Sequence, residues 1–70
     1  MAQVKYFFLN GQKFYTKNDL TLFDITKYFN YNTSLLVLEY NNLIFNKKNW
    51  DKTFIQNNDK IEIVTIVGGG

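Results

Sequence analysis

The sequence predicts a single α+β domain in which a mixed sheet of four to five strands packs on one helix. Three observations predict this class. Short runs of β-branched and aromatic residues recur between turn signals along most of the 70 residues. A single stretch, residues 22–29, has apolar residues at helical spacing. The sequence ends in an Ile- and Val-rich run, which predicts one more strand, followed by three glycines.

The first predicted element is a β-hairpin. Residues 4–9 are β-branched and aromatic, and they lead into Asn10-Gly11. This pair is the strongest short-range hairpin signal, because a type I′ turn needs positive φ at both central positions. Residues 12–16 read as the returning strand, with Phe14 and Tyr15 on opposite faces.

A helix is expected next, from about Leu22 to Phe29. Thr21 and Asp24 match a capping box, in which each side chain bonds the backbone of the other residue. Leu22, Ile25 and Phe29 recur at spacings of three and four and therefore share one helical face. We interpret this aromatic and aliphatic stripe as core packing rather than as a ligand site.

Two short strands are predicted after the helix. The apolar run at residues 35–38 has the length of a buried strand, and residues 43–45 form another. Asn41-Asn42 lies between them and predicts a turn, because Asn tolerates the left-handed region.

Residues 46–55 have weak periodicity and predict one short helical turn. Trp50 and Phe54 are four residues apart, so both are expected to reach the core from this turn. A ligand site around Trp50 is the alternative, but the surrounding sequence offers no cluster of polar partners for it.

The last strand follows a polar turn at residues 57–59 and opens at Lys60. Ile61 and Ile63 are expected to face the core, and Glu62 to face outward with Lys60. The outward face then becomes apolar, which suggests a docking surface for a partner, with cover by a neighbouring strand or loop as the alternative. The residues assigned to this surface are Val64, Ile66 and Val67. A β-bulge would exchange the two faces beyond it.

Composition excludes several classes of function. The chain has no cysteine, histidine or arginine, so it has no thiolate metal site and no convincing set of acid, base and nucleophile for an enzyme. Its eight lysines are scattered and its net charge is only +2, which argues against nucleic acid. No apolar run approaches the length of a membrane span, and no signal peptide opens the sequence.

The glycine tail is the candidate reactive site. We expect residues 1–67 to form the domain and residues 68–70 a flexible tail, because glycine has no Cβ and accepts many backbone angles. The carboxyl group of Gly70 is an anion at neutral pH and a usable nucleophile. A frayed terminus without function is the alternative.

The order of the elements is that of the β-grasp fold, and the sequence resembles the ubiquitin-like sulfur carriers, above all the ThiS family. The matching residues cover the whole chain: 9–11, 37–42, 48–50, 58–64 and 67–70. Asn58 departs from the family, which commonly has Gly in the turn before the last strand. Because Asn is the next best residue at positive φ, we expect the turn to survive. The family shares only the final pair of glycines, Gly69 and Gly70.

The resemblance implies a protein that is itself a substrate. A ThiF-type adenylating enzyme would use MgATP to convert the Gly70 carboxylate into an acyl adenylate, with Gly68 and Gly69 threading the narrow channel of the partner. A persulfide relayed from a cysteine desulfurase would then leave a thiocarboxylate on Gly70. Thiazole synthase would take that sulfur for the thiazole ring of thiamine. The carrier would bind no cofactor or metal of its own and would be a monomer when alone.

Two other functions compete with this one. The first is the small subunit of molybdopterin synthase, which ends in the same pair of glycines. The second is a ubiquitin-like or ribonucleoprotein-type interaction module without sulfur chemistry, in which the glycines are incidental. The abundance of Asn, Lys, Ile, Phe and Tyr without Arg or Pro suggests an AT-rich genome, and so the plastid (chloroplast) stroma or the cytoplasm of an AT-rich bacterium.

Overall fold

The computed structural model of the protein describes residues 3–32 and 35–65, which contain a five-stranded sheet and two helices. The strands are β1 (Lys5–Leu9), β2 (Gln12–Thr16), β3 (Leu36–Tyr40), β4 (Leu43–Ile44) and β5 (Asp59–Thr65). The helices are α1 (Leu22–Tyr28) and η2 (Lys47–Lys52), a 3₁₀-helix. The expected boundary between domain and tail, at residues 67 and 68, lies outside the described residues.

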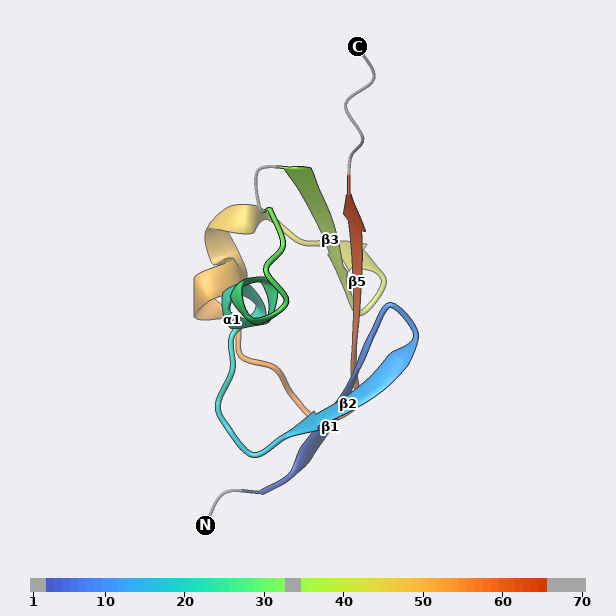
Figure 1. Ribbon diagram of the computed structural model, residues 1–70, viewed down its shortest axis with the longest axis vertical. Helices are drawn as coiled ribbons and strands as arrows, with labels where there is room; N and C mark the ends of the chain where they lie inside the picture. Colours follow the sequence, from blue (N-terminus) through green and yellow to red (C-terminus); the bar gives the residue numbers. More distant parts are fainter. Residues whose placement is uncertain (1–2, 33–34, 66–70) are drawn as a thin grey trace.

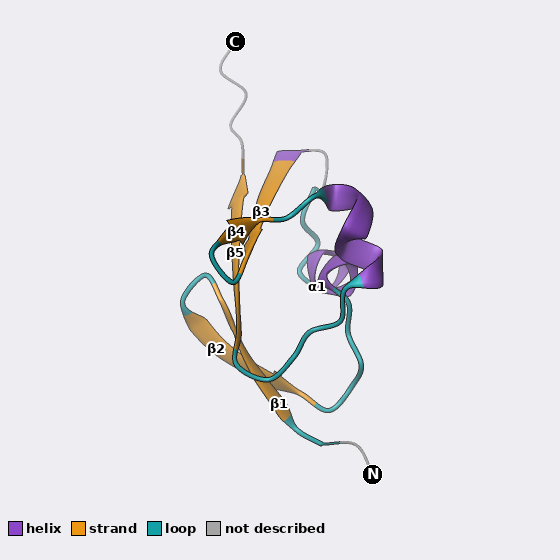
Figure 2. Cartoon of the chain, turned by 180° about the vertical axis from the view of Figure 1, so that it is seen from behind, coloured by secondary structure: helices purple, strands orange, loops and turns teal. Residues whose placement is uncertain are grey.

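The sheet has the strand order β2-β1-β5-β3-β4 (Figure 1). β5 is central and runs parallel to β1 and antiparallel to β3, so the first and last strands of the chain are neighbours. Seen from the front and from behind, α1 and η2 lie on the same side of the strands (Figures 1 and 2). This mixed sheet on one α-helix confirms the β-grasp fold expected from the sequence.

The Asn-Gly turn forms as predicted. Asn10 and Gly11 have φ values of +50° and +81°, as a type I′ turn requires, and they join β1 to β2 in an antiparallel pair. Phe14 faces the core side and stacks on Phe7 with ring centroids 5.8 Å apart, whereas Tyr15 is exposed on the other face. The predicted opposition of Phe14 and Tyr15 is confirmed.

The capping box at the start of α1 is also confirmed. The hydroxyl of Thr21 accepts a hydrogen bond from the backbone N–H of Asp24 at 3.1 Å, and Oδ2 of Asp24 accepts one from the N–H of Thr21 at 3.0 Å. Leu22 and Ile25 are buried and Phe29 packs against the core. The helix ends at Tyr28, one residue earlier than expected.

The expected placement of Phe54 in the core is wrong, because this side chain is 51% exposed. Phe54 lies beyond the end of η2 and forms an isolated β-bridge with Thr21, and the next residue, Ile55, fills the core instead. Trp50 is buried as predicted, and its Nε1–H donates to the carbonyl of Phe45 at 3.0 Å. The single helical turn expected in this region is a longer 3₁₀-helix, Lys47–Lys52.

The run at residues 35–38 is not buried throughout. Leu38 is buried, Leu35 is exposed just before β3, and the residues between them are half-buried. Both helices lie on one side of the sheet, so only alternate residues of β3 face the helices. The sequence also gave no sign that Thr26 on α1 is fully buried, where its hydroxyl donates to the carbonyl of Phe23 at 2.6 Å.

The core lies between the sheet and the helices. Every strand and helix contributes buried apolar residues to it except the edge strands β2 and β4. Its buried apolar residues are Phe7, Leu9, Leu22, Ile25, Leu38, Trp50, Ile55, Ile61 and Ile63. No helix within residues 3–32 and 35–65 is long and apolar enough to cross a membrane.

Candidate functional site

The central strand β5 leads toward the predicted site, and its two faces alternate as expected. Ile61 and Ile63 are buried, whereas Lys60 and Val64 are exposed. The pairing of β5 with β3 advances one residue at a time from Ile61 to Thr65, so no bulge exchanges the faces in this span. β5 begins at Asp59, one residue before the expected start.

A buried carboxylate fixes the start of β5. Asp59 accepts hydrogen bonds from the hydroxyl of Tyr40, from Nδ2 of Asn41 at 3.2 Å and from the backbone N–H of Gln56 at 2.6 Å. Burial, together with the hydrogen bond to the carboxylate and its charge, raises the pKa of Tyr40 well above its ordinary value. The network joins β3, the last turn and β5, and so sets the position of the central strand.

From the sequence, Asp59 is expected only as part of a polar turn. The available signal was its place directly before an alternating strand, but two of its three hydrogen-bond donors, Tyr40 and Asn41, lie far back along the chain. Asn58, in the same turn, has a φ of +71°, which confirms that the turn forms with Asn at this position.

The β1–β2 turn attaches to β5 further along. The N–H of Asn10 donates to the carbonyl of Ile61 at 2.9 Å, and Oδ1 of Asn10 accepts from the N–H of Ile63 at 2.7 Å. The Asn10 side chain therefore continues the β1 side of the ladder after β1 itself has ended at Leu9. Beyond Ile63, no described residue pairs with β5 on this side, and β3 alone borders the strand up to Thr65.

The outward face near the end of β5 is apolar. Val64 is 53% exposed and lies opposite the half-buried Val37 of β3. Closer to the start, the outward face is charged, and Nζ of Lys60 lies 3.7 Å from Oε2 of Glu62. Val64 is thus accessible to a partner. The other predicted site residues, which are Ile66, Val67, Gly68, Gly69 and Gly70, lie outside the described residues.

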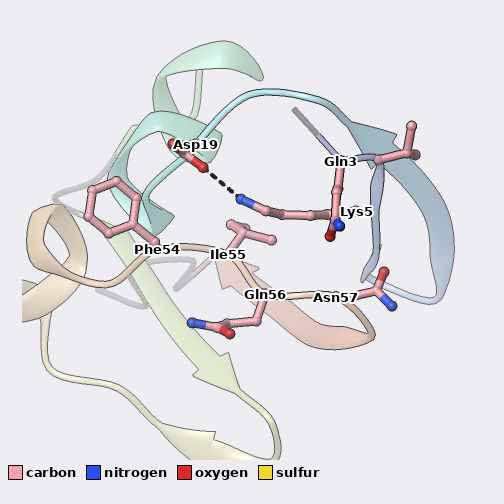
Figure 3. A pocket seen from close by; sticks show the side chains of 8 residues that line it. Gln3, Lys5, Asp19, Phe54, Ile55, Gln56 and Asn57 are labelled. Atoms are coloured by element: carbon pink, nitrogen blue, oxygen red, sulfur yellow. Dashed lines mark hydrogen bonds and ion pairs between the residues drawn. The ribbon is translucent and has the colours of Figure 1, made fainter. Parts of the chain in front are cut away.

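A hollow of about 530 Å³ lies between the start of β1 and residues 54–57 (Figure 3). Nζ of Lys5 reaches Oδ1 of Asp19 at 2.8 Å across it, and this contact lowers the pKa of the exposed Asp19 carboxyl. Oδ1 of Asn57 is also committed, because it accepts from the N–H of Tyr6 at 2.8 Å. The two charged groups that line this hollow therefore pair with each other, and it offers no free charged group for chemistry.

Within the described residues, no group of three or more Asp or Glu side chains is placed to hold a metal ion. The sequence has no histidine or cysteine. The arrangement in the described part of the chain therefore presents a strand firmly anchored at its start, with an apolar, accessible surface beside its end.

Comparison with known proteins places these features in a family. A family model described as the ThiS family matches residues 4–70. A protein named ycf40 from Trieres chinensis is 64% identical over 70 residues, which cover 100% of this chain and 96% of that protein. A ycf40 protein from Porphyra purpurea is 34% identical over 62 residues, covering 89% of this chain and 87% of the relative.

The crystal structure of the thiamine biosynthesis protein ThiS from Geobacter metallireducens has a similar fold. It superimposes with a TM-score of 0.78 over 93% of this chain and 99% of that chain, at 18% sequence identity. This likeness supports the fold, and the match of the family model supports the membership.

Proposed function

The chain belongs to the ThiS family, whose ubiquitin-like fold implies the role of a sulfur carrier, and we propose that it carries sulfur as a thiocarboxylate on Gly70 for the thiazole ring of thiamine. The observation that carries this proposal is the match of the family model over residues 4–70, because it includes the three glycines. The central position of β5 supports it, since the strand that precedes the glycines is anchored on both sides at its start.

The chemistry starts from an unreactive group. A carboxylate is a poor acyl donor, and transfer of AMP from MgATP to the Gly70 carboxylate on a ThiF-type adenylating enzyme creates a good leaving group and releases pyrophosphate. The terminal sulfur of a persulfide, supplied by a cysteine desulfurase, attacks the acyl carbon and expels AMP. A second thiol then breaks the S–S bond, becoming part of a disulfide, and leaves the thiocarboxylate. Thiazole synthase receives the sulfur.

The tail and the surface beside it have separate tasks in this proposal. Gly68 and Gly69 have no side chain, so they fit a channel too narrow for other residues. Val64, Ile66 and Val67 form the docking surface that holds the carrier on its partners. Of these, Val64 is exposed on the outward face of β5. We propose the plastid stroma as its location, and the algal relatives named ycf40 support this proposal.

The test is loading of the purified protein with a ThiF-type enzyme, MgATP, cysteine and a cysteine desulfurase. Intact-protein mass spectrometry should show the replacement of one oxygen by one sulfur, and fragmentation should place the change on Gly70. Deletion of Gly70, or one residue added after it, should abolish loading, and proteolytic removal of the added residue should restore it. Normal loading of the extended protein would disprove the role of Gly70.

Two variants separate the channel from the docking surface. Gly69→Val should block adenylation without changing the free energy of unfolding. Val64→Ala should slow adenylation, whereas Phe54→Ala, which truncates a similarly exposed side chain outside β5, should not. Equal rates for both truncations would remove Val64 from the docking surface.

The pathway is decided by the acceptor of the sulfur. Thiocarboxylated protein should be consumed by thiazole synthase, with formation of the thiazole product, and not by the large subunit of molybdopterin synthase. The opposite preference would assign the carrier to molybdopterin. A stable protein that none of these enzymes loads would instead be an interaction module.

A further inference from the structure

A groove between β2 and α1 lies apart from the end of β5. It has a volume of about 790 Å³ and an apolar floor made by Phe14, Leu20, Ile25 and Phe29. Tyr28 stands at its side, 81% exposed, with its ring edge-to-face on Phe29 at a centroid distance of 5.0 Å. Exposed aromatic side chains beside an apolar hollow are typical of surfaces that bind other proteins.

The strand that borders this groove has an open edge. β2 pairs only with β1 and ends the sheet on that side. The N–H of Tyr6 donates to the side chain of Asn57, and its C=O accepts from the N–H of Asn58. Tyr6 and Tyr15, which lie opposite each other on β1 and β2, therefore exchange no backbone hydrogen bonds. Hydrogen-bonded and non-hydrogen-bonded pairs alternate along β1 and β2, so Lys13, two residues before Tyr15, also makes no backbone hydrogen bonds to β1. The N–H and C=O groups of Lys13 and Tyr15 therefore point away from the sheet and are free to pair with an added strand.

The charge around the groove selects the kind of partner. Lys27 lines it and Lys17 follows the end of β2, and neither ammonium group makes an ion pair within residues 3–32 and 35–65. Of the nearby acids, Asp19 pairs with Lys5, whereas Asp24, which caps α1, also lines the groove. The groove is thus apolar in the middle, and its rim has two lysines, Lys17 and Lys27, against one aspartate, Asp24, which leaves a small excess of positive charge.

We propose that β2 and this groove bind an extended segment of another protein, with alternating apolar residues flanked by carboxylates, which adds to the sheet beside β2. Its apolar side chains would enter the groove next to Phe14, its backbone would pair with Lys13 and Tyr15, and its carboxylates would meet Lys17 and Lys27. A second copy of this chain would bring further lysines to the same edge, and lysine on an edge strand opposes such self-pairing.

This surface is separate from the sulfur-carrier site. Three paired residues lie side by side across the sheet: Phe14 of β2, Phe7 of β1 and Asp59 of β5. Thr65 is six residues further along β5 than Asp59. At about 3.3 Å per residue, the end of β5 is about 20 Å from the groove. A partner held at β2 therefore leaves the end of β5 accessible, and the inference does not depend on the proposed function.

The experiment uses ¹⁵N-labelled protein and a blocked nine-residue peptide with two Asp at each end and Val-Thr-Val-Thr-Val between them. Binding should shift the amide resonances of Phe14 and Phe29 and slow hydrogen exchange at Lys13 and Tyr15. Exchange at Gln12 and Phe14 should hardly change, because their N–H groups already face β1. The same peptide with Lys in place of Asp should bind at least about fivefold more weakly.

Variants locate the site. Tyr28→Ala and Lys27→Glu should each weaken binding of the acidic peptide about threefold to fivefold, whereas Lys48→Glu, an exposed control that does not line the groove, should not. Each variant should load sulfur as the unmodified protein does. The proposal is overturned by the absence of protection at Lys13 and Tyr15, by equal binding of the lysine-flanked peptide, or by a concentration-dependent dimer that protects β2 without peptide.

Discussion

At Asp59, where β5 begins, one buried carboxylate accepts three hydrogen bonds, whereas at Thr65, where the strand ends, only β3 borders it within the described residues. The start lies between β1 and β3 and is buried on its inner face. The last two residues of the strand, Val64 and Thr65, are both exposed.

Under the proposed function, this difference would let one strand serve both the fold and a partner. Burial and hydrogen bonds at the start contribute stability, and they fix the position of the strand in the sheet. At the end, Val64 is exposed, and no described residue pairs with the strand on the side of β1. Mutations at the two ends should therefore separate effects on stability from effects on binding.

The largest effect is expected from truncation inside the core near the start of β5. Ile61→Ala should lower the free energy of unfolding by about 2–5 kcal/mol, because Ile61 is fully buried and the change leaves a cavity. Val64→Ala, near the other end of the strand, should change it by no more than about 0.5 kcal/mol. Denaturant unfolding of both variants measures the contrast, and equal losses would contradict the division between the two ends.

Removal of the carboxylate at the start should rank next. Asp59→Ala leaves the hydroxyl of Tyr40, the amide of Asn41 and the N–H of Gln56 without their acceptor, and should cost about 3 kcal/mol. Asp51→Ala, at an exposed aspartate on η2, is the control and should be nearly neutral. Thermal and denaturant melts give both values. A neutral Asp59→Ala would mean that the network does not anchor β5.

A smaller loss is expected where the β1–β2 turn meets β5. Asn10→Gly keeps the positive φ but removes the acceptor for the N–H of Ile63, and should cost about 1 kcal/mol. The matched control is Asn58→Gly, also at positive φ, whose side chain makes no such bond to β5. Hydrogen exchange at Ile63 should speed up in the first variant and stay unchanged in the second. If both variants lost the same stability and Ile63 exchanged alike in both, the loss in Asn10→Gly would come from the greater backbone freedom of glycine and not from the missing hydrogen bond.

The smallest effect is expected at alkaline pH. Burial and the Asp59 carboxylate raise the pKa of Tyr40 in the folded protein, whereas an unfolded tyrosine titrates near pH 10. Above about pH 10 the unfolded chain loses this proton and the folded protein keeps it, so this contribution to stability is complete below pH 10 and falls as pH rises toward the folded pKa. Tyr40→Phe should flatten the decline between pH 9 and 11, and chemical denaturation of the variant and the unmodified protein across this range can measure the difference.

Much of the fold was predictable because its signals are local. The Asn-Gly turn, the capping box of Thr21 and Asp24, and the alternation of β5 each depend on residues within a few positions of one another. The outward position of Val64 followed from that alternation once the register showed no bulge. Of the predicted site, only Val64 falls within the described residues, so the roles of Ile66, Val67 and the three glycines stay predictions.

The sequence by itself determined where the chain turns, which segment is helical and which residues of β5 face inward, because backbone sterics and side-chain periodicity act over a few residues. Only the tertiary structure decided that Ile55 rather than Phe54 is buried, and that the side chains of Asn10 and Asp59 hold β5 in place. Most of these outcomes depend on distant partners: Asp59 accepts from Asn41 and Tyr40, 18 and 19 residues away, and Asn10 accepts from Ile63, 53 residues away. A hydrogen bond or a packed contact over such a separation exists only after the sheet has brought both groups together, so no local pattern encodes it.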